Sequence, residues 1–423
     1  MSGRPVDGGA SGRPSPAEVR LARAWLSRAV EPGRGVVYDF VSAVGPVEAT
    51  RKLRIGGAPG GVAGSAEARR HEDRAASDLE RAAALGARLV TPEDDEWPDG
   101  PLRAMEIAYA RERASRSLHA SGSGEPAATA TGSSSERRVE LTPPLALWVL
   151  GPVRVDEAFS RAVAVVGSRS STPYGEHVAA DLAHGLAGRR WTVVSGGAYG
   201  IDGAAHRVAL AAGGCTVAVV AGGLEQPYPR GHAALFARVA REGLLVTEWP
   251  PDATPQRHRF LVRNRLIAGL TAGTVVVEAG LRSGALATAR QAVRAGRPVM
   301  GVPGPVTSAE SAGVHLLLRD REDAQLVTRA AEVVEVVGAI GDDLAPRPEG
   351  PRSPRDELEP VAVQVLDGLP TVGAVSPDRI AVAAGVPPLA VLRCLPGLEL
   401  RGLVEATPDG WQLTPAARRP VRR

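Results

Sequence analysis

The sequence predicts an α/β protein with a doubly wound parallel sheet at its centre, a small helical domain before the sheet and a small helical domain with two strands after it. Three observations lead to this prediction. Short apolar runs alternate with helix-like segments across residues 141–338, Gly-, Pro- and Ser-rich breaks interrupt the chain at 115–138 and 341–355, and residues 357–417 depart from the central pattern. Continuous apolar strands separated by helices are typical of a parallel sheet that is buried on both faces.

The N-terminal part is predicted to be an arm followed by a helical domain. Residues 1–15 are rich in Gly, Pro, Ser and Arg and are expected to be disordered. Residues 16–90 carry helical periodicity, clearest at 18–30 and 71–85. Between these two helices, residues 39–50 resemble the helix–Gly-Pro–helix turn of helix-hairpin-helix or SAM-like modules. Such a turn offers backbone amides to phosphate, and a helical packing domain without a ligand is an equally open interpretation.

A lead-in with a low-complexity insertion is predicted for residues 91–140. Its Ser-, Gly-, Ala- and Thr-rich part, 115–138, has no apolar period. Such a composition is typical of a linker or an inserted flexible loop.

The central block, 141–338, is predicted to alternate strands and helices. Strands are expected at 163–166, 192–194, 216–220, 244–247, 274–277 and 298–302. Helices are expected at 175–188, 203–212, 232–242, 263–270 and 284–295. Right-handed crossovers then give a doubly wound, Rossmann-like sheet whose ligand crevice lies at the carboxyl ends of the strands.

The C-terminal part is predicted to be a winged helix at 357–417, joined by a linker at 339–356. Helices are expected at 360–369, 376–384 and 388–403, and Asp409-Gly410 marks a hairpin between 404–405 and 411–413. The third helix has only Arg393 and Arg401 as basic residues, so a protein contact or a degenerate role is at least as well supported as groove recognition. The basic tail, 418–423, adds nonspecific phosphate affinity.

Composition leaves the partner open. Lys and Arg number 50 against 47 acids, a net charge of +3, and the single lysine is Lys52. Nucleic acid can therefore bind only through a local basic patch. Cys215 and Cys394 are expected to be unpaired thiols. An N-terminal signal core is lacking, and no apolar run approaches the roughly 20 residues that span a bilayer, so a cytoplasmic protein without membrane insertion is expected.

Special turns follow several predicted strands and indicate an anion site. Glycines there allow close backbone approach, and the next helix directs its first amides at the crevice. Arg169 adds a guanidinium that can clamp phosphate. Neither Gly-x-x-x-x-Gly-Lys-[Ser/Thr] nor Gly-x-Gly-x-x-Gly after the first strand occurs, so neither P-loop hydrolysis nor a dinucleotide cofactor is expected. No cofactor is predicted.

The densest basic run of the central block, 257–265, contains an aromatic residue. Its arginines can contact successive phosphates, and Phe260 could stack on a base. A solvated helix start with Phe260 in the core is an equally supported alternative. The candidate DNA-binding residues of all these turns are Gly167, Ser168, Arg169, Ser195, Gly196, Gly197, Tyr199, Phe260, Arg263, Asn264, Arg265, Arg282, Ser283 and Gly284.

Asp202 and His206 are spaced i, i+4 and could face each other on one helix. A structural pair that caps the helix is the preferred interpretation, because no third ligand or nucleophile accompanies them. No catalytic residue and no metal site are therefore predicted, and the protein is not expected to be an enzyme.

The motifs together resemble the DprA (DNA-processing protein A, also called Smf) family. The matching pieces are Val166-Gly-Ser-Arg169, Ser195-Gly-Gly-Ala-Tyr-Gly-Ile-Asp202, Tyr228-Pro229, Arg263-Asn-Arg-Leu-Ile-Ala-Gly-Leu270, Val277-Glu-Ala279 and Val302-Pro-Gly304. The resemblance implies a Rossmann-like core that binds single-stranded DNA, a homodimer, and a role in natural transformation in which incoming strands are protected and RecA recombinase is loaded.

Carried over to this chain, the resemblance implies that Arg169 and the glycine turns at 167 and 196–197 hold phosphate, with Arg263 to Arg265 along the same pocket. The chain departs from the family at Tyr199, where many members carry Lys or Arg, and at His315, where an Asn is usual. Two alternatives stay open: a nucleotide-processing enzyme of the phosphoribohydrolase type, whose Pro-Gly-Gly-x-Gly-Thr-x-x-Glu motif is absent here, and a nucleotide sensor that signals through the winged helix.

Overall fold

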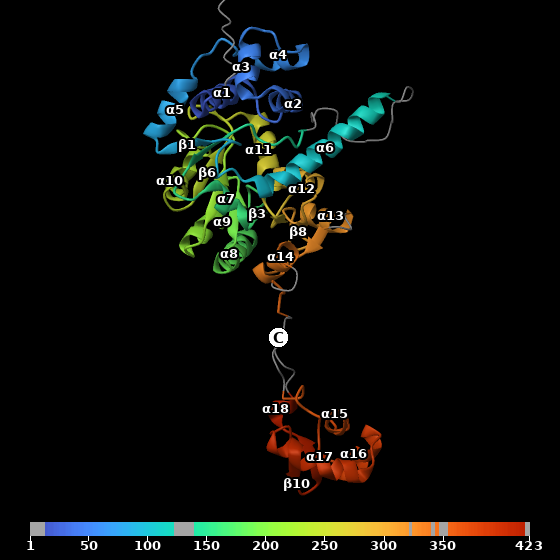
Figure 1. The fold of residues 1–423 in the computed structure, drawn as a ribbon. Coiled ribbons are helices and arrows are strands. Elements are labelled where there is room, and N and C mark those ends of the chain that lie inside the picture. The colour runs from blue at the N-terminus through green and yellow to red at the C-terminus, as the bar shows by residue number, and fades with distance from the viewer. Residues whose placement is uncertain (1–12, 122–138, 321–323, 340–342, 347–353, 419–423) are drawn as a thin grey trace, which may run out of the picture. The chain divides into compact units, whose positions relative to one another are not determined.

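The computed structural model describes residues 13–121, 139–320, 324–339, 343–346 and 354–418. The chain divides into two compact units, Met1–Ala345 and Pro346–Arg423, and each is described by itself (Figure 1).

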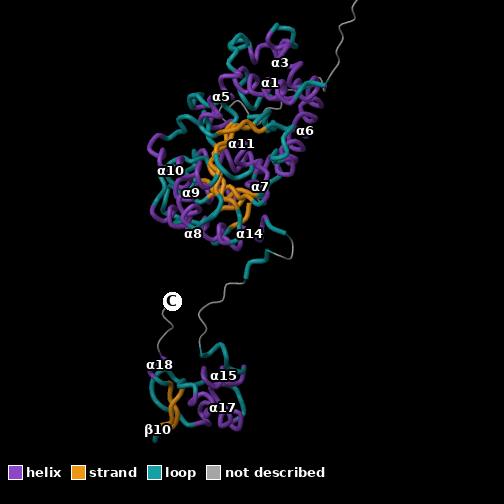
Figure 2. Tube along the Cα trace, turned by 60° about the vertical axis from the view of Figure 1, so that its left-hand side comes forward, coloured by secondary structure: helices purple, strands orange, loops and turns teal. Residues whose placement is uncertain are grey.

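The larger unit is built on one nine-stranded sheet, which Figure 2 shows in orange among the helices. Its strands are β1 (Ala87–Val90), β2 (Leu147–Leu150), β3 (Ala162–Val166), β4 (Thr192–Ser195), β5 (Thr216–Val219), β6 (Leu244–Thr247), β7 (Gly273–Val276), β8 (Val299–Gly301) and β9 (Ala324–Leu326). Their order across the sheet is β1-β2-β6-β5-β4-β3-β7-β8-β9. Strands β3 to β9 pair in parallel, which confirms the predicted α/β class.

Two antiparallel pairings lie at one edge of the predicted parallel sheet. Strand β1 pairs antiparallel with β2, and β2 pairs antiparallel with β6. Strands β1, β2 and β9 were not predicted. Strands β1 and β9 have only three or four residues, including an arginine or a glutamine, and so lack a continuous apolar run.

Helices cover both faces of the sheet, as a doubly wound fold requires. They are α7 (Val155–Ser160), α8 (Pro173–Gly188), α9 (Ile201–Ala211), η1 (Arg230–His232), α10 (Ala233–Glu242), α11 (Arg257–Leu270), α12 (Gly284–Arg294), α13 (Ala312–Asp320) and α14 (Ala330–Val337). On β3, Val163 and Val165 pack in the core beneath α8, α9 and α14, whereas Ala164 and Val166 pack beneath α11 and α12. This alternation follows from the two-residue period of a strand.

Helix α11 begins six residues before the predicted start at Arg263. The apolar period is clear only from that residue, but arginine is a good helix former, so the basic run 257–265 continues the helix. Because the run is helical, its arginines lie on different faces of α11 and therefore have different surroundings.

The predicted N-terminal helical region forms a cap on the sheet, here called the helical cap. Its helices are α1 (Pro16–Ala29), α2 (Gly35–Val44), α3 (Pro46–Arg54), α4 (Gly60–Ala66) and α5 (Ala75–Ala84). Ser15 and Glu18 form a capping box at the start of α1. Trp25 of the cap shares a core with Trp148 of β2, whose indole Nε1 donates to Ser27 Oγ at 3.1 Å. The cap is therefore part of the larger unit.

The helix–Gly-Pro–helix turn of the cap lies between α2 and α3. Gly45 adopts φ 81°, and its amide donates to Val41 O at 2.9 Å, which ends α2. This amide is thus used inside the cap.

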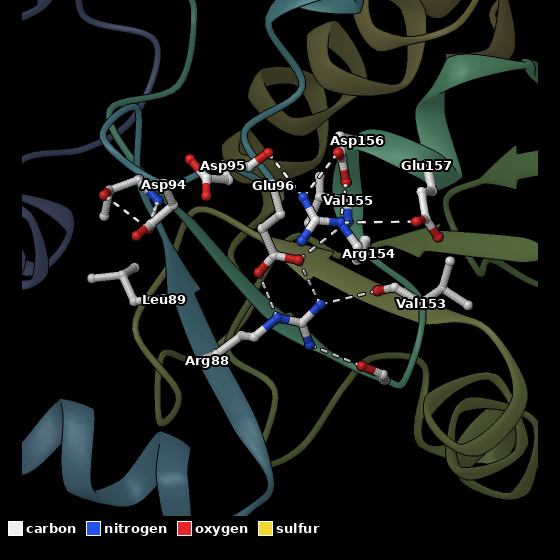
Figure 3. Close-up of polar contacts among 12 residues, drawn as sticks. Arg88, Leu89, Asp94, Asp95, Glu96, Val153, Arg154, Val155, Asp156 and Glu157 are labelled. Atoms are coloured by element: carbon white, nitrogen blue, oxygen red, sulfur yellow. Dashed lines mark hydrogen bonds and ion pairs between the residues drawn. The ribbon is translucent and has the colours of Figure 1, made fainter.

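The lead-in segment is held to the sheet by ion pairs (Figure 3). Arg88 of β1 pairs with Glu96 at 2.6 Å and donates to Gly151 O at 2.9 Å. Arg154 pairs with Asp156 at 3.0 Å and donates to Asp95 O at 2.9 Å. These contacts join the loop after β1 to the start of α7.

The linker expected at 115–138 starts later than predicted, because helix α6 (Asp99–Ser121) continues through its first seven residues. Their side chains through Ser117 are mostly exposed, so a helix forms there without an apolar period. Arg113 pairs with Asp39 at 3.1 Å, and Arg116 pairs with Glu140. Residues 122–138 lie outside the described part of the chain.

The smaller unit has the predicted helices and hairpin of a winged helix. Its elements are α15 (Pro360–Asp367), α16 (Pro377–Ala384), α17 (Pro388–Leu400), β10 (Val404–Thr407), β11 (Gly410–Leu413) and α18 (Pro415–Arg418). Among the described residues, no single helix is long and apolar enough to cross a membrane, and only α16 and α17 together, bent by 106°, have the length and composition for it.

Candidate nucleic-acid interface

A pocket of about 850 Å³ lies where the strand order reverses. Strand β3 has β4 on one side and β7 on the other, so the connections that leave these neighbouring strands run in opposite directions. In a doubly wound sheet, this point opens a crevice at the carboxyl ends of the strands. The pocket walls come from the turn after β3, the turn after β7 and one face of α11.

The turn after β3 presents Arg169 to the pocket. Gly167 is required by close packing, because an added Cβ would lie 2.4 Å from Ile201 Cγ1. Ser168 N donates to Glu278 O at 2.7 Å, which ties this turn to the neighbouring one after β7. The Arg169 side chain is exposed, and its guanidinium lies 5.4 Å from the ring centre of Phe260. The turn is therefore rigid at its base and charged at its tip.

One face of helix α11 forms the second wall. Arg257, Phe260, Asn264 and Ile267 line the pocket at i, i+3, i+7 and i+10. The half-buried ring of Phe260 also contacts Tyr228 edge to face, with ring centres 5.7 Å apart. Both rings line the pocket, so aromatic surface and positive charge lie side by side.

Arg263 forms the floor of the pocket and is 4% exposed. Its guanidinium donates to Gly196 O at 3.0 Å, to Val219 O, and to Asn264 Oδ1 at 3.1 Å, which leaves Nη2 without a partner among the described residues. Burial lowers the pKa of Arg263 to about 10, against the attraction of Asp202. Arg263 thus stays cationic near neutral pH.

The turn after β7 and the start of α12 form the third wall. Arg282 is exposed here, and Ser283 Oγ accepts from Ala285 N at 3.3 Å as the helix cap. The N-terminus of α12 lies at a pocket that already holds positive charge, and the helix dipole there suits an anion. Ser283 and Gly284 both line the pocket.

The charge of the pocket is unbalanced. Among the described residues, no carboxylate lies within ion-pair distance of Arg169, Arg257 or Arg282. Two carboxylates, those of Asp202 and Glu310, also line the pocket, and both accept hydrogen bonds from neighbouring groups. Asp202 Oδ2 accepts from Gly196 N at 3.1 Å and from Ala198 N at 3.3 Å, and Glu310 accepts from Ser170 Oγ at 3.2 Å. In the described part of the chain, no three His, Cys, Asp or Glu side chains are grouped to hold a metal ion.

Comparison with known proteins assigns this architecture. The family model of DNA recombination-mediator protein A matches residues 135–338, and that of the DprA winged helix domain matches 349–410. The putative DNA processing protein DprA of Mycobacterium tuberculosis is 50% identical over 394 residues, which cover 93% of this chain and 94% of that protein. The chain belongs to the DprA family.

Two further relatives extend the match. Protein Smf of Escherichia coli is 41% identical over 271 residues, which cover 63% of this chain and 71% of that protein. The X-ray structure of DprA from Streptococcus pneumoniae superposes with a TM-score of 0.57 at 25% identity and covers 76% of this chain and 98% of that one. The predicted family resemblance is confirmed, and the chain is a DNA-processing protein of the DprA family.

Nine of the predicted DNA-binding residues line the pocket of this DprA-family chain. They are Gly167, Ser168, Arg169, Phe260, Arg263, Asn264, Arg282, Ser283 and Gly284.

The turn after β4 was expected to bind phosphate, but its predicted residues have other contacts. Ser195 is fully buried and donates from Oγ to Val165 O at 2.7 Å. The amide of Gly196 is taken by Asp202, and an added Cβ on Gly196 would lie 2.5 Å from Arg263 Nη2. Gly197 has φ 69° and packs against Phe236. This turn supports Arg263, and Ser195, Gly196 and Gly197 do not line the pocket.

Tyr199 and Arg265 are also outside the pocket wall. Tyr199 is 48% exposed, and its ring contacts His232 with centres 4.8 Å apart. Arg265 is fully buried on another face of α11 and forms two contacts with Glu248, at 2.6 and 2.8 Å. The prediction that Arg265 lies along the pocket was wrong, since a paired, buried guanidinium cannot reach a ligand.

The expected pairing of Asp202 with His206 was wrong as well. Asp202 turns toward the amides described above, and His206 Nδ1 lies 2.8 Å from Thr216 Oγ1. Burial raises the pKa of Asp202, although Arg263 opposes the shift, and burial lowers the pKa of His206 to about 3. Both side chains fix the fold around β4.

Several pocket residues were missing from the predicted set, and three of them have charged or aromatic side chains that bear on binding: Arg257, Tyr228 and Glu310. Arg257 stands in the basic run and Tyr228 in a family motif, so both carried a sequence signal. Glu310 carried none, because it lies in the loop after β8 beyond the Val302-Pro-Gly304 motif. His315, a departure from the family, lies outside the pocket wall, with Nε2 3.1 Å from Gly304 O.

Proposed function

We propose that the chain binds single-stranded DNA in the pocket at the end of β3 and β7. The observation that carries this proposal is a group of three arginines, Arg169, Arg257 and Arg282, that come from three different elements, line one pocket and have no carboxylate partner in the described part of the chain. Unpaired like charges repel, so their grouping favours a polyanionic ligand. Phosphates can neutralise them, and the binding then weakens as salt rises.

The aromatic wall supports a single strand over a duplex. Phe260 and Tyr228 lie beside the arginines, and base–aromatic stacking needs an exposed base face. In a duplex the faces of the bases are covered by their neighbours in the stack. A strand with unstacked bases can place phosphates on the arginines and a base on an aromatic ring at the same time.

The family supports the biological setting. Its model is named for a DNA recombination mediator, and we propose that this chain protects incoming strands and delivers them to RecA recombinase as a homodimer during natural transformation. Light scattering tests the dimer. A RecA strand-exchange assay on DNA coated with single-strand-binding protein tests the delivery. The proposal expects faster strand exchange, because RecA filaments form faster, and an unchanged rate of strand exchange contradicts it.

Fluorescence anisotropy with a labelled oligothymidine and its duplex, over a salt series, tests the binding site. Arg169→Ala is expected to weaken single-strand affinity about tenfold and to reduce the slope of log affinity against log salt by about 0.7, the loss of one phosphate contact. Arg241→Ala is the matched control, because Arg241 is exposed on α10, outside the pocket. The proposal would be overturned if the chain bound the single strand and the duplex equally well and if Arg169→Ala bound the single strand as tightly as Arg241→Ala. Release of nucleobase from a nucleoside monophosphate would favour an enzyme.

A further inference from the structure

Helix α11 presents its arginines to two different surroundings. Arg257 and Arg263 line the pocket, whereas Arg259 and Arg265 are buried on other faces and paired with carboxylates. Arg265 pairs with Glu248, which directly follows β6, so this contact does not involve the helical cap. The pairing of Arg259 reaches into the helical cap, because its partner is Glu31, in the loop between α1 and α2.

Glu31 holds Arg259 through both carboxylate oxygens. Oε1 accepts from Arg259 Nη2 at 2.6 Å, and Oε2 accepts from Arg259 Nε at 3.2 Å. Two more donors fix the carboxylate: Arg69 Nη2 at 2.6 Å and Trp249 Nε1 at 3.1 Å. Arg259 also lies 5.4 Å from the Trp249 ring centre. Four hydrogen bonds, two of them from Arg259, hold the Glu31 carboxylate and the Arg259 guanidinium in one orientation.

The first turn of α11 has no side-chain N-cap. Its N-cap residue, Gln256, makes no side-chain hydrogen bond to the helix. The first amides of a helix have no acceptors within the helix, so an uncapped start frays easily. The Arg259 side chain instead ties this turn to the segment before the helix, since Nη1 donates to Thr254 O at 2.9 Å while Glu31 holds the other nitrogens. The same turn carries Arg257 and Phe260 into the pocket.

We propose that Glu31 is a positioning residue for the pocket: through Arg259 it fixes the first turn of α11 and thereby places Arg257 and Phe260 against the strand. This inference rests on the proposed binding function and deepens it, because it makes the helical cap part of the binding device. Glu31 does not line the pocket and so contributes no direct contact with DNA.

A double-mutant cycle in the full chain tests the inference by single-strand anisotropy. Glu31→Gln and Arg259→Gln are each expected to weaken affinity about fivefold, and the double variant is expected to be no weaker than either single one, because both act through one contact. Additive losses would overturn the action through Arg259. Glu31→Asp keeps the charge and is expected to recover part of the affinity.

Asp78→Asn is the matched control, because Asp78 is a fully buried carboxylate of the same cap that pairs with Arg28 at 2.5 Å. It is expected to lower the midpoint of unfolding without changing the affinity of the folded protein. Hydrogen exchange gives a second readout: Glu31→Gln should accelerate exchange at the first turn of α11 and leave α12 unchanged. Unchanged exchange there would overturn the inference, and Glu31→Asp provides the measurement if Glu31→Gln does not fold.

Arg169→Ala separates the two proposals. If Arg169→Ala weakens binding and Glu31→Gln does not, the positioning role fails and the binding site stands. If neither variant changes affinity, the proposed binding function itself fails.

Discussion

Arginines gather in two regions of the larger unit, and their surroundings differ. On the pocket walls, Arg169, Arg257 and Arg282 have no carboxylate partner among the described residues. At the seam, the contact between the helical cap and the sheet, Arg28 and Arg74 both pair with Asp252, at 2.5 and 2.7 Å. Arg259 pairs with Glu31 in the same way.

The difference teaches which arginines serve the fold. A buried guanidinium needs a carboxylate partner or several hydrogen bonds, and removing the carboxylate of a buried pair leaves an uncompensated charge. Exposed arginines that repel one another do not help folding, and they persist where a ligand supplies the opposite charge. Seam arginines should therefore control stability, and pocket arginines should control affinity. Among Arg28, Arg74 and Arg259 of the seam, only Arg259 is also expected to act on affinity, through the first turn of α11.

The largest effect is expected inside the core beside the seam. Glu248→Ala leaves Arg265 buried without a partner and should lower the free energy of unfolding by about 3–5 kcal/mol, measured by urea denaturation. The double change Glu248→Leu/Arg265→Met should recover most of the loss, since an apolar pair of similar volume can replace a buried ion pair. A loss of single-strand affinity in the double variant would break the division between the two regions.

The second effect belongs to the pocket. Arg169→Ala/Arg282→Ala should weaken single-strand binding about 100-fold, at about 1.4 kcal/mol for each tenfold step. The free energy of unfolding should stay the same or rise slightly, because a repulsive pair is removed. Anisotropy and urea denaturation on the same preparation check both parts, and a marked fall in stability would show that these arginines serve the fold.

The third effect acts on the floor of the pocket through a glycine. An added Cβ at Gly196 would lie 2.5 Å from Arg263 Nη2, and that guanidinium is held by several hydrogen bonds. Gly196→Ala should therefore displace Arg263, lower the free energy of unfolding by about 1–3 kcal/mol and weaken single-strand binding several-fold. Gly188→Ala is the matched control, because no atom lies within 4 Å of an added Cβ at that position. Unchanged affinity in Gly196→Ala would remove Arg263 from the binding site.

The seam should also respond to acid. Burial opposes ionisation of Glu31, but hydrogen bonds from Arg259 and Arg69 outweigh it and lower its pKa from 4.5 to about 2. A carboxylate with a lowered pKa stabilises the fold fully above its unfolded value and loses that contribution as the pH falls through the folded value. The difference in unfolding midpoint between the native chain and Glu31→Gln should therefore shrink between pH 4.5 and 2. A constant difference would contradict the assigned charge.

The sheet and much of the pocket were predictable, because apolar runs and strand-end turns are local patterns. Arg169, Phe260 and Arg282 follow from such turns and from a basic run. The burial and pairing of Arg265 and Arg259 were not predictable. A helix places residues two positions apart on different faces. Their partners, Glu248 and Glu31, are not next to them in the basic run, and Glu31 is distant in sequence. Gly196 was misjudged for a different reason: the carboxylate that takes its amide, Asp202, is near in sequence, but only the conformation of the folded turn brings the two together.

The smallest effect is expected in the winged helix. Helix α17 exposes Leu389, Leu392 and Leu400, which are 60, 54 and 91% exposed, and its basic residues are limited to Arg393, with Arg401 directly after its end. A face of this kind offers little to phosphates, which bind through Lys and Arg. Arg393→Ala/Arg401→Ala should therefore change single-strand and duplex affinity less than twofold in the same anisotropy assay. A tenfold loss would instead place unpaired, functional arginines in the smaller unit, and the contrast between pocket and seam would no longer account for DNA binding by the whole chain.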